Sequence, residues 1–209
     1  MLTSTRSILI VLALSVLLFT GCSKTSVTGS WKKSDYAGQP FTSILVVGLT
    51  GEPNNKLLWE NVMADKLRQN GLAQVSTTIT AFPNDREIDK NEIIDFVKSK
   101  GFEAVLVTRL VDTKKEEVYH PPSGGYYGGA YGHYSHFNSY YPHAYNQVYS
   151  PGYTATMTTV LLETNLYRTD TQELIWSMSS DTFDPRSVNQ LVDSVSKKVL
   201  ATLKKDKLI

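Results

Sequence analysis

The chain has 209 residues, of which 41% are hydrophobic and 20% are charged. This composition predicts a folded protein rather than a disordered one, and the length suits one domain with a substantial core. The 21 lysine and arginine residues nearly balance the 20 aspartate and glutamate residues, which argues against nucleic acid as a partner. A single cysteine excludes an internal disulfide and a cysteine-based metal cluster.

The first 21 residues have the pattern of a signal peptide. Arg6 supplies a positive start, and Ile8–Phe19 is an almost uninterrupted apolar run. A membrane-spanning helix needs about 20 apolar residues, whereas this shorter run fits the core of a signal peptide. We therefore expect residues 1–21 to be removed by cleavage between Gly21 and Cys22.

The end of this leader, Leu18-Phe19-Thr20-Gly21-Cys22, resembles the lipobox of bacterial lipoproteins. The resemblance implies a thioether diacylglycerol on Cys22 and an acylated amino terminus, with no other cofactor. Each buried CH₂ group contributes about 0.8 kcal/mol, so several acyl chains would hold the protein at a membrane. Residue 23 is serine, which by the same resemblance favours the outer membrane, with the domain in the periplasm. The alternative is an ordinary secreted protein with a spare cysteine.

Residues 22–42 are expected to join the lipid to the folded part of the chain. The segment 23–30 is small and polar, which is typical of a flexible tether. Strand-like and helix-like segments alternate after it, so we predict a single domain over residues 43–209.

The first half of this domain alternates strands with helices. Apolar, β-branched runs predict strands, and apolar spacings of three and four residues predict helices. Gly71 and Gly101 follow the two helices as stop signals. The expected elements are a strand at 43–49, a helix at 54–70, a strand at 72–80, a helix at 89–100 and a strand at 102–111.

The second half begins with a sharp change of composition. Residues 119–153 hold 10 of the 12 tyrosines and all four histidines, together with glycines and prolines that oppose regular structure. Two strands at 154–167 and 173–183, joined by a polar turn, predict an antiparallel hairpin. Asp184-Pro185 then predicts the start of a last helix, whose apolar spacing is the strongest periodic signal in the chain.

The order β-α-β-α-β, long loop, β-β-α predicts an α/β fold, an α+β sandwich. We expect one mixed sheet of about five strands covered by helices. The pattern leaves the strand order open. Right-handed crossovers would place both early helices on one face if the first three strands lay in simple order.

This order of elements resembles the amino-terminal domain of TolB. It also resembles the curli-assembly outer-membrane lipoprotein, lipoprotein activators of penicillin-binding proteins, and uncharacterised envelope lipoproteins. The predicted hairpin resembles their pattern of a strand, an Asp-Thr-Gly-Glu turn and a strand ending near Trp, with Gln172 in place of the usual glycine. It reads Leu166-Tyr167-Arg168-Thr169-Asp170-Thr171-Gln172-Glu173-Leu174-Ile175-Trp176. The resemblance implies envelope assembly or protein binding rather than catalysis.

The tyrosine-rich segment is the candidate binding element. Tyrosine combines a large contact face with few torsions to freeze, so a Tyr/Gly/Ser-rich loop suits recognition of a partner. The alternative is a low-complexity insertion without a specific partner. The tyrosines that carry the binding hypothesis are Tyr126, Tyr127, Tyr131, Tyr134, Tyr140, Tyr141 and Tyr145.

Histidines in the same segment suggest a second hypothesis. Imidazoles bind Zn²⁺ and Cu²⁺, but a long loop loses entropy when it closes around a metal. Solvated polar residues are the simpler interpretation. The four candidates are His120, His133, His136 and His143.

The sequence lacks the usual sets of catalytic residues. It has no Gly-x-Ser-x-Gly elbow and no complete phosphate loop after the first strand, and no small-molecule substrate is evident. We therefore expect a non-catalytic, lipid-anchored binding or assembly accessory protein of the cell envelope. Metal capture by the histidines is one alternative, and a structural lipoprotein that associates with itself is another.

Overall fold

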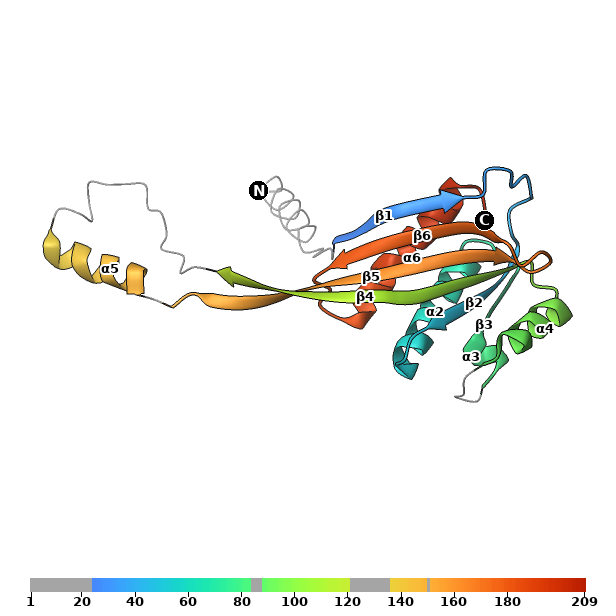
Figure 1. Cartoon of the computed structure of the whole chain (residues 1–209), viewed down its shortest axis with the longest axis horizontal. Helices are drawn as coiled ribbons and strands as arrows, with labels where there is room; N and C mark the ends of the chain where they lie inside the picture. The colour runs from blue at the N-terminus through green and yellow to red at the C-terminus, as the bar shows by residue number, and fades with distance from the viewer. Residues whose placement is uncertain (1–23, 84–87, 121–135, 150) are drawn as a thin grey trace, which may run out of the picture.

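The computed structural model describes residues 24–83, 88–120, 136–149 and 151–209 (Figure 1). One mixed sheet of six strands, in the order β1-β6-β5-β4-β2-β3, forms the body. The strands are β1 (Lys24–Lys32), β2 (Ser43–Leu49), β3 (Gln74–Thr77), β4 (Ala104–His120), β5 (Tyr153–Arg168) and β6 (Leu174–Phe183). The helices are α2 (Pro53–Gln69), α3 (Thr78–Ala81), α4 (Lys90–Lys100), α5 (Phe137–Tyr149) and α6 (Val188–Lys205).

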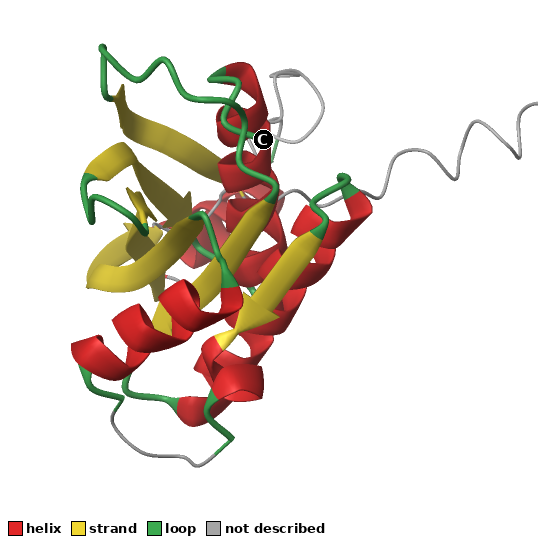
Figure 2. Cartoon of the chain, turned by 90° about the vertical axis from the view of Figure 1, so that its right-hand side faces the viewer, coloured by secondary structure: helices red, strands yellow, loops and turns green. Residues whose placement is uncertain are grey.

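Helices cover both faces of the parallel part of the sheet (Figure 2). Strand β2 lies between β3 and β4 and is parallel to both. The crossover from β2 to β3 therefore runs in the opposite direction to the one from β3 to β4, and right-handed connections place α2 and α4 on opposite faces. The expected mixed sheet covered by helices is confirmed, with six strands and with the two early helices separated.

The larger core lies on the face covered by α2 and α6. It contains Trp59, Met63 and Leu67 from α2, and Val195 and Val199 from α6, all buried. A smaller core joins α4 to the other face through buried Val97, Phe102, Leu45 and Val47. Burial on both faces explains why β2 is a continuous apolar run, as predicted for 43–49.

The predicted tether over 22–42 is wrong for residues 24–32, which form edge strand β1. This strand pairs antiparallel with β6 from Lys24↔Phe183 to Lys32↔Trp176. The hydroxyl of Thr25, buried beneath α6, donates to Ser194 Oγ at 2.8 Å and lies 2.9 Å from Thr182 Oγ1. Small polar residues look like a linker in sequence, but here their hydroxyl groups satisfy one another at the edge of the core.

Several element bounds differ from the expected ones. Strand β3 is short and continues directly into α3, and β4 runs to His120, well beyond the predicted end at residue 111. Part of the segment 119–153, expected to lack regular structure, forms helix α5. Helix α6 begins at Val188, not at Asp184-Pro185, because the Ser187 side chain accepts the N–H of Gln190 as its N-cap.

The predicted hairpin is confirmed as β5 and β6, which pair antiparallel from Thr159↔Phe183 to Tyr167↔Leu174 with one register shift between Leu166 and Tyr167. Gln172, at the position where glycine was expected, has a φ of +58°. That left-handed conformation is the one glycine adopts at least cost, so the turn keeps its geometry despite the substitution.

Asp193 on α6 joins the two helices of the larger core face. Its carboxylate lies 2.7 Å from Lys197 Nζ and 3.0 Å from Lys66 Nζ of α2. The hydrogen bond from Lys197 is the main reason that the pKa of Asp193 is lowered, and Lys66 adds to it.

Replacing Asp193 by asparagine is expected to lower the free energy of unfolding by less than about 1 kcal/mol near neutral pH, because the ion pairs are half-exposed. A lowered pKa means that the contribution is present above the ordinary value of about 3.9 and is lost as pH falls through the folded pKa. Urea unfolding of both proteins from neutral to acidic pH measures this. A difference that grows below about pH 4 would contradict the assignment.

Candidate functional site

A two-stranded arm projects from the body of the molecule (Figure 1). The last residue of β6 pairs with Thr159 of β5, which pairs with Lys114 of β4. Beyond this row, residues 115–120 and 153–158 form strand pairs only with each other, and the Asp184 N–H donates to the Thr158 carbonyl oxygen at 2.6 Å. We call these two segments the arm. Six residue pairs at about 3.4 Å each give it a length of about 20 Å.

Both outer edges of the arm expose backbone hydrogen-bonding groups. In the part of the chain that the structure describes, no third strand pairs with either segment. Lys115, Glu116 and Glu117 place charges near the base of the arm, and Val118 and Tyr119 follow toward its end. Unpaired strand edges are templates for strand addition by another chain, and charges restrict which chain can add.

The far end of the arm is closely packed. The rings of His120 and Tyr153 stack with their centroids 4.9 Å apart. A Cβ atom added to Gly152 would lie 2.5 Å from the carbonyl oxygen of His120, so the chain requires glycine at this close approach.

Helix α5 follows at the end of the arm, and it carries an aromatic stripe. Phe137, Tyr141, Tyr145 and Tyr149 repeat every fourth residue, and their neighbouring rings are 5.3, 5.9 and 4.4 Å apart. Their exposed fractions are 72%, 52%, 49% and 68%. Only three residues separate Tyr149 from Tyr153 of the arm, so the helix lies within about 14 Å of the arm's end.

Of the predicted binding tyrosines, the structure describes Tyr140, Tyr141 and Tyr145, which all lie on α5 and are exposed. Tyr141 and Tyr145 belong to the stripe. Phe137 and Tyr149 were not among the predicted residues, although their spacing of four from the tyrosines was visible in the sequence. Tyr126, Tyr127, Tyr131 and Tyr134 lie outside the described residues.

The structure describes the side chains of two of the four candidate histidines, His120 and His136. Among the described residues, no group of three or more histidine, cysteine or acidic side chains is placed to hold a metal ion. His120 stacks on Tyr153, and His136 is exposed just before α5. His133 and the side chain of His143 lie outside what the structure describes. Metal capture stays a prediction.

The predicted cleavage and lipidation residues, Gly21 and Cys22, also lie outside the described residues. The described chain begins at Lys24, in the same row as Phe183, Thr159 and Lys114. Strand β1 runs from this row away from the arm, so the first described residue lies at the end of the body from which the arm projects. None of the described helices is long and apolar enough to cross a bilayer.

An apolar crevice of about 250 Å³ lies at the carboxyl end of β2, between the first turns of α2 and α6. The side chains at its mouth, Leu49, Leu110 and Val188, are exposed. Trp59 lines it, and the buried indole Nε1 has no hydrogen-bond partner among the described residues. The chain leaves the neighbouring strands β2 and β4 toward opposite sides of the sheet, to β3 and to β5, and open α/β sheets hold ligands at such a point.

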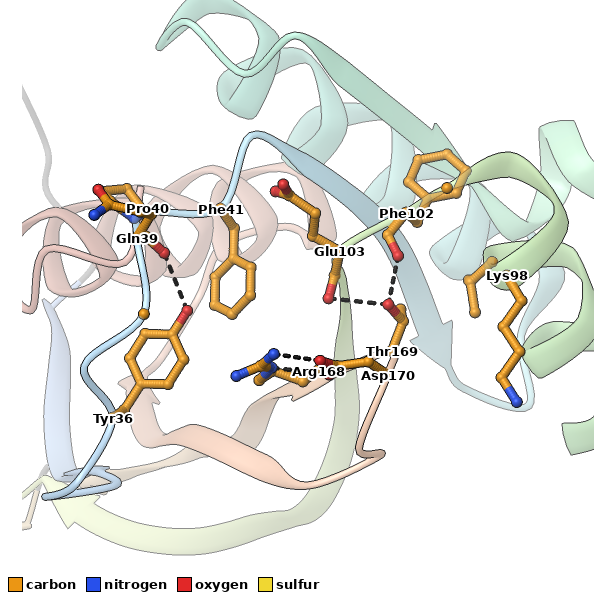
Figure 3. Close-up of a pocket in the computed structure, with 13 residues that line it drawn as sticks. Tyr36, Gln39, Pro40, Phe41, Lys98, Phe102, Glu103, Arg168, Thr169 and Asp170 are labelled. Atoms are coloured by element: carbon orange, nitrogen blue, oxygen red, sulfur yellow. Dashed lines mark hydrogen bonds and ion pairs between the residues drawn. The ribbon is translucent and has the colours of Figure 1, made fainter.

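A larger depression of about 450 Å³ lies at the opposite end of the sheet (Figure 3). Several of its polar groups are engaged with the protein itself. Glu103 accepts hydrogen bonds from the backbone N–H groups of Thr42, at 2.6 Å, and Ser43, at 3.2 Å. Thr169 donates to the carbonyl oxygen of Phe102, and the Tyr36 hydroxyl donates to that of Gln39 at 3.0 Å.

The titratable groups of this depression support a structural role. Arg168 Nε donates to Asp170 Oδ1 at 2.9 Å, which lowers the pKa of Asp170 and raises that of Arg168. The pKa of Tyr36 is raised, chiefly by burial. Arginine and aspartate thus stay charged and paired, and the tyrosine stays neutral, at neutral pH. These groups brace the chain around the β5–β6 turn.

No protein-family model and no curated protein matches the chain. Solved structures with a similar chain path include a PelC dodecamer from Paraburkholderia phytofirmans, which is 14% identical in sequence with a TM-score of 0.48. The match covers 86% of this chain and 97% of the PelC chain. A PelC variant dodecamer from the same organism is 11% identical, with a TM-score of 0.45 and coverages of 84% and 94%. Lipoprotein GNA1162 from Neisseria meningitidis is 15% identical, with a TM-score of 0.42 and coverages of 78% and 98%.

Proposed function

We propose that this chain is a lipid-anchored, non-catalytic accessory protein of the bacterial cell envelope, held at the outer membrane through Cys22 and facing the periplasm. It binds another envelope protein through the arm. The leader and the sequence Leu18-Phe19-Thr20-Gly21-Cys22 support the anchor. The projecting arm, with two free strand edges, supports the binding role.

The arm is the observation that carries this proposal. A hairpin of two strands is only marginally stable in water, and this one extends about 20 Å beyond the sheet that would support it. Its side chains contribute nothing to either core. A partner that adds a strand at the edge of 115–120 or 153–158 would satisfy the exposed backbone groups and stabilise the arm.

Self-association is the second candidate, and edge strand β1 favours it. Trp31 and Val27 on this strand are exposed large hydrophobic residues. Beyond β1 the sheet has no further strand among the described residues. A second copy that paired along β1 would cover these side chains and continue the sheet.

An arm-shortened variant tests the main proposal. Lys114 and Thr159 are cross-strand partners, so a two-residue Asn-Gly turn can join them directly in place of residues 115–158. Because the body keeps all its core residues, the variant is expected to fold. We expect crosslinking in intact cells to capture a partner protein with the natural chain and to lose it with the variant.

A matched control changes a residue at the end of the sheet that lies away from the arm. Replacing Trp31 by serine leaves the arm intact and should preserve the crosslinked partner. Capture of the same partner by the arm-shortened variant would contradict the proposal. If Trp31→Ser instead removes a crosslink between two copies of the chain, self-association along β1 replaces the arm as the binding mode.

A further inference from the structure

The aromatic stripe of α5 (Phe137, Tyr141, Tyr145 and Tyr149) has the chemistry of a membrane–water interface. Helix α5 contains no aspartate, glutamate, lysine or arginine. A tyrosine side chain combines an apolar ring with a hydroxyl that remains hydrated, and such side chains gather at the level of lipid headgroups. The stripe is exposed along the whole length of the helix.

This helix lacks the features that stabilise an isolated helix in water. It has 13 residues, which is marginal without tertiary packing, and Pro142 lies inside it and removes a backbone donor. It has no substantial packing against any other element of the described chain. A surface that buries the stripe would supply the stabilisation that the helix does not receive from the body.

The position of the anchor indicates which surface this is. Lys24 lies in the row Phe183, Thr159 and Lys114, from which the arm extends. Cys22 is two residues upstream, and two extended residues span at most about 7 Å. The lipid proposed for Cys22 therefore leaves the body at the end from which the arm projects, and the arm is longer than this link.

We propose that the aromatic stripe of α5 lies in the headgroup region of the membrane that holds the chain. This inference rests on the proposed function for the anchor at Cys22, but the chemistry of the stripe does not depend on the anchor. The stripe buries its rings beside the acyl chains, and the hydroxyl groups stay at the water-filled surface. The protein then contacts the membrane at two places, with the arm between them and its strand edges exposed.

The test uses the mature chain from Cys22 to Ile209 with Cys22→Ser, so that no lipid contributes. Flotation with vesicles of phosphatidylethanolamine and phosphatidylglycerol measures the bound fraction. We expect the natural stripe to bind, and we expect replacement of Phe137, Tyr141, Tyr145 and Tyr149 by serine to reduce binding at least about tenfold. The control replaces Trp31, an exposed aromatic residue at the end of β1 away from the arm, by serine. This variant should bind vesicles as the natural chain does.

A second measurement reports position without disturbing the helix. Tyr145→Trp, made in a chain that also carries Trp31→Phe, places the fluorophore in the stripe, while Trp59 and Trp176 are buried in the body. We expect lipids brominated on their acyl chains to quench the added emission. Absence of vesicle binding, equal binding of the serine variant, or an unquenched Tyr145→Trp each overturns the inference.

A separate measurement tests the anchor, so that its failure can be distinguished from failure of the membrane role of the stripe. Metabolic labelling with palmitate reports lipidation of Cys22 in the full chain, and Cys22→Ser should abolish it. If the full chain is labelled but its unlipidated form does not bind vesicles, the anchor is supported and the membrane role of the stripe is refuted. If the full chain is not labelled but the mature form binds vesicles, the membrane role of the stripe is supported and the anchor is refuted. Crosslinks from Tyr145 to a protein, without vesicle binding, assign the stripe to that protein instead.

Discussion

Replacing Glu60 by alanine is expected to lower the free energy of unfolding by about 3–5 kcal/mol, because three buried or part-buried donors lose their acceptor. Glu60 is fully buried on α2. Its carboxylate accepts the backbone N–H groups of Gly48, at 2.9 Å, and Ile79, at 3.1 Å, and also the hydroxyl of Thr78. One side chain thus fixes the end of β2 and the start of α3 to the helix.

Urea unfolding of the purified mature chain measures this loss. Glu60→Gln is the matched control, because its amide oxygen can still accept from Gly48 and Thr78 while its NH₂ group faces the N–H of Ile79. We expect the glutamine variant to lose less than the alanine variant. Equal stability of Glu60→Ala and the natural chain would show that water or a shift of α3 satisfies the three donors.

Replacing Trp176 by alanine is expected to cost about 3–5 kcal/mol, as for other large-to-small substitutions in a core. Trp176 is fully buried on β6 under α6, and its indole Nε1 donates to Asp206 Oδ2 at 2.9 Å. Lys32 of β1 donates to the Asp206 carbonyl oxygen at 2.7 Å. The ring therefore supports the edge of the sheet and the end of the chain together.

Trp176→Phe separates the ring from its hydrogen bond. It keeps most of the buried volume and removes the donor to Asp206, so we expect a loss of about 1–3 kcal/mol. Thermal unfolding followed by far-UV circular dichroism compares the two variants with the natural chain. A phenylalanine variant as unstable as the alanine variant would mean that the bond to Asp206, and not the packing, dominates.

Burial decides which elements could be predicted from the sequence. Strand β2 is buried on both faces and is therefore a continuous apolar run, whereas helix α6 has one face in the core, so its apolar residues recur with the helical period. The last nine residues of β4, 112–120, are exposed or nearly so, and therefore carry no apolar alternation. Their strand conformation depends on pairing with β5, which a local pattern does not record.

The candidate site could be predicted only in part for the same reason. Its tyrosine-rich composition was visible, and Tyr141 and Tyr145 were identified from it. Proline and glycine predicted an irregular loop, so helix α5 and the stripe partners Phe137 and Tyr149 were missed. The free edges of the arm follow from the strand order β6-β5-β4-β2, which depends on tertiary pairing.

The row formed by Lys114, Thr159 and Phe183 separates two parts of the chain that can change independently. On one side, a substitution must fit a packed core. On the other, the described strand residues 115–120 and 153–158 contribute no side chain to either core, so insertions or exchanges there leave the core untouched. The body can thus stay unchanged while the sequence of the arm varies. Proteins with this body could therefore acquire new binding partners through changes in the arm alone.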